Sequence, residues 1–187
     1  MPDVMANPHL AAWDASLAES ARTARALTAN LTPALQDRRP SWGGWSVGEI
    51  FEHLCITDGL YVAPLRTLLA VERGRPAPRL GDAWSPTIWG RLLLWSLNPL
   101  NTRPSPAPRK FMPGSTPRAN VIDAWLAQVE TDRALMREAD GLDLRRLKLS
   151  SPAARLIRLN AGDAFAVMAV HTQRHLGQVR RTLDDAR

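Results

Sequence analysis

The chain has 187 residues, a length that suits one domain better than two. Hydrophobic residues make up 45% and charged residues 22%, ordinary proportions that exclude a wholly disordered chain. A single cysteine excludes a disulfide framework and any multi-cysteine metal site. The net charge of +6 suggests an anionic partner without choosing among nucleic acid, lipid and small acids.

The positive charge is spread along the chain. Of the 24 basic residues only Lys110 and Lys148 are lysines, a bias that coding preference alone can produce. No more than two cations are adjacent, whereas a nucleic-acid-binding protein more often clusters them on one element. We therefore expect no nucleic-acid partner.

Neither a secretory signal nor a membrane span is expected. Residues 1–7 lack the basic and apolar regions of a signal peptide. The most apolar stretch, residues 84–97, contains a proline, a glycine and an arginine and is shorter than the roughly 20 residues that cross a bilayer. Cys55 falls inside a predicted helix, where we interpret it as a small buried hydrophobe rather than a nucleophile. Together these features predict a cytoplasmic protein.

Two long helices are predicted in the first part of the chain. The first starts at Asn7-Pro8, a cap followed by proline, and an apolar stripe at three- and four-residue steps carries it to about residue 36. The second starts at Ser46, which forms a capping box with Glu49, and extends to about residue 72.

Two more helices are predicted near the end. One follows Thr116-Pro117 and reaches about Ala139, with Gly141 as a plausible stop. The last starts between residues 160 and 163 and runs to about Asp184. The intervening residues, 142–158, look like a loop, and no strand is predicted. The expected fold class is therefore all-α, a four-helix bundle that forms a single domain over residues 1–187.

Residues 76–117 interrupt this pattern between the second and third long helices. They hold nine of the fifteen prolines, and we predict a short amphipathic helix at residues 88–97 within them. We interpret the segment as an insertion that packs over one end of the domain or forms a lid. Its three tryptophans, Trp84, Trp89 and Trp95, could lie on an anionic membrane, but we favour packing over the bundle.

Histidine is scarce, so the positions of the four histidines are informative. His171 and His175 are four residues apart on the last helix, a spacing that lets two imidazoles converge on one metal ion. His53 lies on the second helix, and His9 is expected to be exposed near the start of the first. Composition and residue spacing do not predict that His53 lies near His171 and His175.

Two segments resemble a known family. Residues 45–54, WSVGEIFEHL, resemble the W-S-x-x-E-x-x-x-H-L segment of the DinB/YfiT-like helical bundle family. Residues 171–178, HTQRHLGQ, resemble the closing H-x-x-R-H-x-x-Q segment of that family. The order of the helices agrees as well, and the resemblance covers roughly residues 8–184.

The resemblance implies a metal site between the helices. The ligands it implies are His53, His171 and His175, which would hold a divalent metal, Zn or Ni in the first place and Fe or Mn as alternatives. Three protein ligands leave a position open for water or substrate, as in catalytic sites. Helix spacing suggests four further side chains that could orient the imidazoles: Glu49, Glu52, Thr57 and Gln178.

The family also implies a chemistry, for which three alternatives stay open. The first is an enzyme whose metal activates a low-molecular-weight thiol, such as bacillithiol or mycothiol. Such an enzyme would transfer the thiol to a small-molecule substrate or use it to isomerise the substrate. The second is a hydrolase that uses metal-activated water, although Gln173 and Arg174, not a glutamate, stand between the paired histidines. The third is a non-catalytic, stress-related bundle. A homodimer is expected in each case.

Overall fold

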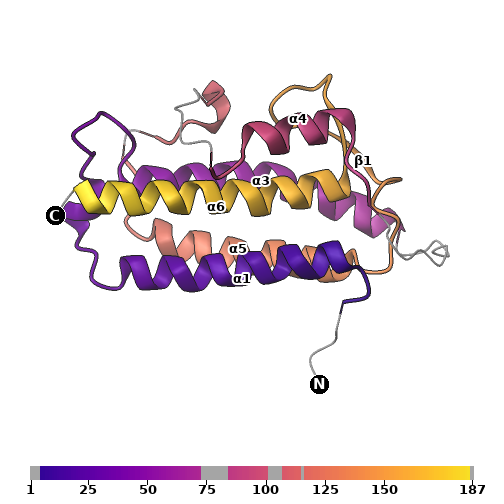
Figure 1. Ribbon diagram of the computed structural model, residues 1–187, viewed down its shortest axis with the longest axis horizontal. Coiled ribbons are helices and arrows are strands. Elements are labelled where there is room, and N and C mark those ends of the chain that lie inside the picture. Colours follow the sequence, from indigo (N-terminus) through magenta and orange to yellow (C-terminus); the bar gives the residue numbers. More distant parts are fainter. Residues whose placement is uncertain (1–4, 73–83, 101–106, 115, 186–187) are drawn as a thin grey trace.

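The computed structural model describes residues 5–72, 84–100, 107–114 and 116–185. Four long helices form the bundle, as predicted: α1 (Pro8–Thr28), α3 (Val47–Glu72), α5 (Val121–Glu138) and α6 (Ala161–Asp185). Figure 1 shows them side by side along the longest axis of the molecule. The shorter elements are α2 (Pro33–Asp37), α4 (Ile88–Ser96), the 3₁₀ turn η1 (Arg109–Phe111), and strands β1 (Lys148–Ser150) and β2 (Arg158–Asn160). The fold class is all-α.

The first predicted helix is shorter than expected. α1 ends at Thr28, where the Thr28 carbonyl accepts a hydrogen bond from Leu31 N at 3.1 Å and closes a turn. Pro33 is the cause, because its ring would clash with the carbonyl four residues earlier and it has no N–H to continue the ladder. Pro33 instead starts α2, whose cap Thr32 accepts from Leu35 N at 3.3 Å.

The start of α3 follows the predicted capping box. Ser46 N donates to Glu49 Oε2 at 2.9 Å, and Glu49 N donates to Ser46 Oγ at 3.2 Å. These two bonds satisfy two amides at the buried end of the helix. In the described part of the chain, α3 is the one helix long and apolar enough to span a bilayer, but it packs against α5 and α6 as a core helix of the bundle.

Two predictions in the second half of the chain are wrong. α5 begins at Val121 rather than at Pro117, because Pro117 lies against Gly48 at the start of α3 and the chain turns once more before the helix. Residues 142–158 are not only loop: β1 and β2 pair antiparallel, with Leu149 opposite Leu159 and both side chains buried. A three-residue strand is too short for alternation to reveal it.

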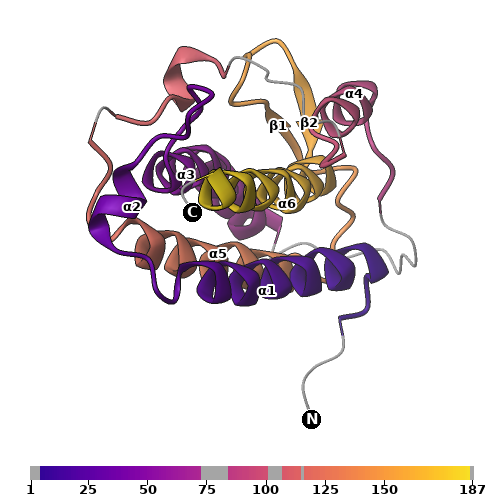
Figure 2. The ribbon, with the colours of Figure 1, turned by 60° about the vertical axis from the view of Figure 1, so that its left-hand side comes forward.

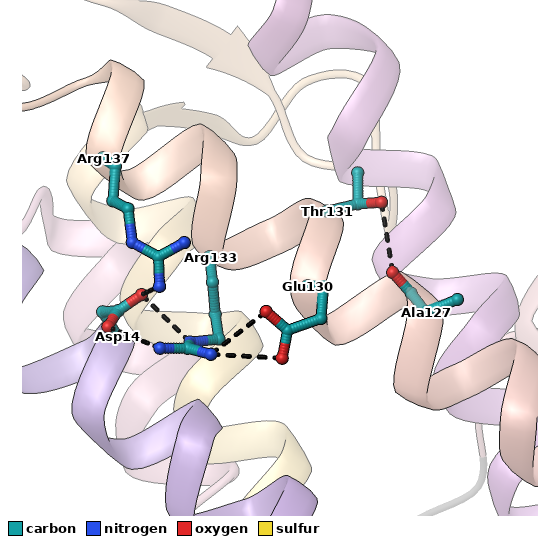
Figure 3. Close-up of polar contacts among 6 residues, drawn as sticks. All are labelled: Asp14, Ala127, Glu130, Thr131, Arg133 and Arg137. Atoms are coloured by element: carbon teal, nitrogen blue, oxygen red, sulfur yellow. Dashed lines mark hydrogen bonds and ion pairs between the residues drawn. The ribbon is translucent and has the colours of Figure 1, made fainter.

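The buried apolar side chains form one cluster, most of them on the four long helices. Figure 2 shows these helices as two pairs, α3 with α6 and α1 with α5. Phe51 of α3 and Trp125 of α5 meet in the cluster, with ring centroids 5.0 Å apart. Outside the core, α1 and α5 are joined by ion pairs (Figure 3). The Arg133 guanidinium forms two 3.1 Å bonds to the Asp14 carboxylate, and Arg137 approaches the same carboxylate at 2.9 Å. A bidentate, partly shielded pair of this kind can contribute about 1 kcal/mol.

The described part of the insertion packs on the first turn of α6. Thr87 caps α4 by accepting from Gly90 N at 2.9 Å, and its hydroxyl donates to Asp163 Oδ2 at 2.7 Å. The approach is close, since a Cβ on Gly90 would lie 2.3 Å from Asp163 Oδ1 and one on Gly162 would lie 2.0 Å from the Trp84 ring. Gly90 thus lets α4 contact α6 directly, and Gly162 makes room for the Trp84 ring.

The tryptophans of the insertion divide between two environments. Trp84 packs over the bundle as expected, against Trp13 and His9, and donates to Asn160 Oδ1 at 3.1 Å. Trp89 and Trp95 lie on the outer side of α4 and are largely exposed, so for them the expectation is wrong. The reason is that Gly90, Leu93 and Leu94 already fill its inner side. Residues 76–83, 101–106 and 115 of the insertion lie outside the described residues.

A pair of carboxylates is buried between α3 and α5. Asp58 and Asp132 are 2% and 0% exposed. Burial raises the pKa of Asp132 to about 7, although a 2.8 Å hydrogen bond from Gln128 acts in the opposite direction. Burial and the charge of Asp132 also raise the pKa of Asp58. Within the described residues, Asp132 Oδ2 has no hydrogen-bond partner.

Replacing Asp132 by Asn should therefore stabilise the protein at alkaline pH. The unfolded carboxyl ionises near pH 3.9 and the folded one near pH 7, so the wild type loses stability as pH rises between these values. At about pH 8 we expect the free energy of unfolding of Asp132→Asn to exceed that of the wild type by about 1–3 kcal/mol. The advantage should vanish near pH 4. Urea unfolding at both pH values measures it, and Asp123→Asn, an exposed position on the same helix, should show no gain.

Candidate metal centre

Three buried histidines meet at one point between α3 and α6. His53 is held by the capped first turns of α3, and His171 and His175 project one turn apart from α6. His53 Nε2 lies 3.2 Å from His171 Nε2, and His175 Nε2 lies 3.0 Å from the same atom. The fold therefore brings together the three histidines, which are distant in sequence.

In two of these rings, the Nδ1 atom, which points away from the cluster, is hydrogen-bonded to an oxygen. His53 Nδ1 is 2.7 Å from the Phe111 carbonyl oxygen, and His175 Nδ1 is 2.9 Å from Gln178 Oε1. Because both partners are oxygens that only accept, each Nδ1 must carry the proton. The Nε2 atoms of His53 and His175 consequently point unprotonated lone pairs toward the centre of the cluster.

Burial keeps all three rings neutral. It lowers the pKa of His53, although the Phe111 carbonyl acts in the opposite direction. Burial, with smaller contributions from the neighbouring histidines and Arg174, lowers the pKa of His171 well below the usual range. For His175, burial together with the charge of His53 lowers the pKa to about 3. Neutral imidazole is the form that binds metal ions.

The arrangement fits a metal ion better than a hydrogen-bonded cluster. His171 Nε2 can carry one proton at most, so it can donate to one of its two neighbours and must face the lone pair of the other. A cation between the rings removes that repulsion. Nitrogens bound tetrahedrally to one Zn²⁺ at about 2.0–2.1 Å would be about 3.3 Å apart, close to the separations in the cluster. The three histidines could thus hold a divalent metal.

The other predicted site residues are dispersed. Gln178 bonds an imidazole, as described above. Glu49 is engaged in the capping box and pairs with Arg39, whose Nε donates to Glu49 Oε2 at 2.9 Å. Glu52 pairs with Arg118, and the hydroxyl of Thr57 donates to the carbonyl of His53, not to its ring. Helix spacing placed these residues near His53 but could not show which way each side chain turns.

Two groups of the site were missed from the sequence. The Phe111 carbonyl has no signature, because every residue carries one and only the path of the insertion brings this one to His53. Trp45 could have been found, since it opens the motif that contains His53. Its ring lies 4.7 Å from the His53 ring and 6.2 Å from the His175 ring, measured between centroids, so it covers one side of the cluster.

Cys55 lies two residues after His53 on α3 but is not a reactive thiol. It is partly buried, and this burial raises its pKa to about 11, although the charge of Arg118 acts in the opposite direction. The thiol is therefore protonated at neutral pH. This agrees with its interpretation as a structural side chain.

The fold and the histidine cluster together define a helical bundle with a three-histidine centre. The family model of the DinB superfamily matches residues 16–179, and the chain belongs to this superfamily. No curated protein and no solved structure matched the chain in the corresponding comparisons. The family thus supports the arrangement of helices and histidines, and any activity has to be argued from the site itself.

The ring of His175 should not titrate in the physiological range. In metal-free protein, we expect it to stay neutral with its proton on Nδ1 from about pH 8 to about pH 5, since burial holds its pKa near 3. Imidazole ¹⁵N shifts measured by NMR report both the charge and the tautomer. A titration midpoint near 6.5, or a proton on Nε2, would contradict the geometry described above.

Proposed function

We propose that the protein is a metal-dependent enzyme in which His53, His171 and His175 hold a divalent cation that activates a low-molecular-weight thiol. The observation that carries the proposal is the convergence of the Nε2 atoms, with two protons held on the outer side of their rings. The reaction would be a thiol transfer to, or an isomerisation of, a small-molecule substrate.

The proposal depends on the orientation of the histidine ligands and on the metal that they suit. His53 and His175 are oriented by the Phe111 carbonyl and by Gln178, so their donor atoms are fixed before the ion arrives. Three imidazoles suit Zn²⁺ and Ni²⁺, with Fe²⁺ and Mn²⁺ as alternatives, and leave at least one coordination position for a ligand. A bound divalent cation lowers the pKa of a coordinated thiol and so supplies thiolate at neutral pH.

The surroundings of the cluster favour a thiol over water as the nucleophile. Metal-dependent hydrolases commonly add a carboxylate general base to the metal-bound water, but Glu49 and Glu52 are paired with arginines, and no carboxylate in the described ranges joins the histidine cluster. A thiol bound to a divalent cation would release its proton to solvent, and the resulting thiolate would then attack without a general base. Since Cys55 is protonated, the thiol would come from a separate molecule.

Metal-activated water remains the second candidate, and a non-catalytic bundle the third. The open position that would accept a thiol would also accept water, so the hydrolase is supported by the same three ligands. In all three cases we propose a protein that does not act on nucleic acid, since its cations are scattered along the chain.

Replacing His171 should abolish metal binding. His171 Nε2 lies within 3.2 Å of both other donor atoms, so its loss leaves two ligands of three. Untagged wild-type protein, loaded with Zn²⁺ and desalted, should retain about one ion per chain, whereas His171→Ala and His171→Gln should retain less than about a tenth of that amount. Elemental analysis by mass spectrometry measures the ratio.

His9→Ala is the matched control for this experiment. His9 is the remaining histidine and packs against Trp13 and Trp84, away from the cluster, so its replacement should leave the metal content unchanged. Circular dichroism establishes that each variant is folded. Equal metal content in the wild type and in both folded His171 variants would refute the three-histidine site.

A small thiol should enter the coordination sphere of the metal. With Co²⁺ in place of the native ion, N-acetylcysteine should produce a thiolate-to-cobalt absorption band in the near ultraviolet, because the open position accepts sulfur. N-acetylserine, which has a hydroxyl in place of the thiol, should leave the spectrum unchanged. Metal binding without any response to the thiol would contradict the thiol proposal and favour activated water.

A further inference from the structure

Helix α4 presents an apolar face to solvent. Ile88, Leu92 and Trp95 are one turn apart and are 72%, 51% and 73% exposed, and Trp89 beside them is 43% exposed. The opposite side of the helix is used for packing, with Gly90 buried and Leu93, Leu94 and Leu97 partly buried against the core. Both sides of the helix therefore carry apolar residues, but only one side is covered by the rest of the protein. We call the exposed residues Ile88, Trp89, Leu92 and Trp95 the α4 face.

The α4 face is held in place by the contacts of its own helix. Thr87 and Asp163 join the start of α4 to α6, and Arg174 Nη1 donates to the Asn98 carbonyl at 3.1 Å just beyond its end. Figures 1 and 2 show α4 on the outside of the bundle, where it covers one end of α6. The face is therefore fixed outward and cannot turn inward without breaking these contacts.

The segment that carries the face has charged residues of one sign. Residues 83–122 contain four arginines and one lysine but no aspartate or glutamate. Arg91 of α4 and the η1 residues Arg109 and Lys110 are exposed. Both views show η1 and α4 on the same upper side of the molecule. Arg118 differs from these cations, since it pairs with Glu52.

We propose that the α4 face binds the surface of an anionic lipid bilayer. Tryptophan and aliphatic side chains insert into the boundary between headgroups and acyl chains, while neighbouring arginines and lysines attract anionic headgroups. Here Trp95, Leu92 and Ile88 supply the inserting side chains, and Arg91, Arg109 and Lys110 supply the charge. The protein would then associate peripherally with the membrane and keep its histidine cluster in the bundle.

A second copy of the chain fits this face less well. A two-fold interface centred on α4 would place the same patch on both sides and so bring Arg91 of each copy toward the other, with no carboxylate on this segment to compensate. A single nine-residue helix also offers less than the roughly 800 Å² per partner that a stable interface buries. An anionic bilayer, in contrast, carries negative charge that complements the arginines and lysine, and its surface is larger than the face.

Flotation of the full chain with vesicles tests the proposal. The wild type should float with phosphatidylglycerol–phosphatidylcholine vesicles, should stay behind with pure phosphatidylcholine, and should float less at about 0.5 M NaCl because salt screens the charges. Trp95→Ser combined with Leu92→Ser should weaken partitioning about tenfold or more, and Arg91→Gln should weaken it on anionic vesicles. These side chains are exposed, so the variants should keep the fold.

Trp42→Ser provides the matched control. Trp42 is also an exposed tryptophan, at 56%, but it lies in the loop before α3, and its replacement should leave flotation unchanged. The proposal is overturned if the wild type does not float on anionic vesicles, or if the α4 variants float as well as the wild type. A dimer in sedimentation that the α4 variants abolish, without lipid binding by the wild type, would also overturn it and assign the face to a second copy.

Discussion

The structure depends on one constraint at its centre, the direction of the imidazole protons. The Phe111 carbonyl and Gln178 fix the Nδ1 protons of His53 and His175 on the outside, so that lone pairs face inward at hydrogen-bond distance from His171. At the centre of such a cluster two lone pairs face at most one proton, so a cation there is favourable. The capping box of α3 and the packing of α6 against it serve to keep these rings in place.

The insertion has a part in this constraint. Its η1 turn supplies the carbonyl that orients His53, and its α4 helix is joined to α6, the helix that carries the other two histidines. A segment that is rich in proline and outside the bundle thereby contacts one histidine directly and the helix of the other two. The same segment carries the exposed apolar face and the carboxylate-free run of charge.

Much of the fold was predictable because its signals are local. The capping box of Ser46 and Glu49, the proline after Asn7 and the spacing of apolar residues each act within a turn or two. They placed the four long helices within a few residues, except for the end of α1. The helix break and the late start of α5 were missed because Pro33 and the contact of Pro117 with Gly48 overrode the periodic pattern. The hairpin was missed because three-residue strands are too short to show alternation.

The site was predictable only in part. The pair on α6 follows from spacing, whereas the meeting of His53 with it was implied by the family resemblance and lies beyond any local rule. Which polar neighbours face the rings depends on side-chain rotamers, so Gln178 was found while Glu49, Glu52 and Thr57 turned elsewhere. The Phe111 carbonyl depends on the path of the whole insertion, which no spacing encodes.

The most direct measurement of the central claim is an anomalous-difference map from a crystal of the Zn²⁺-loaded protein, recorded at the zinc absorption edge. The account predicts one strong peak about 2.0–2.1 Å from the Nε2 atoms of His53, His171 and His175, with the Nδ1 atoms of His53 and His175 still bonded to Phe111 and Gln178. A peak elsewhere, or no peak between these three rings, would contradict it.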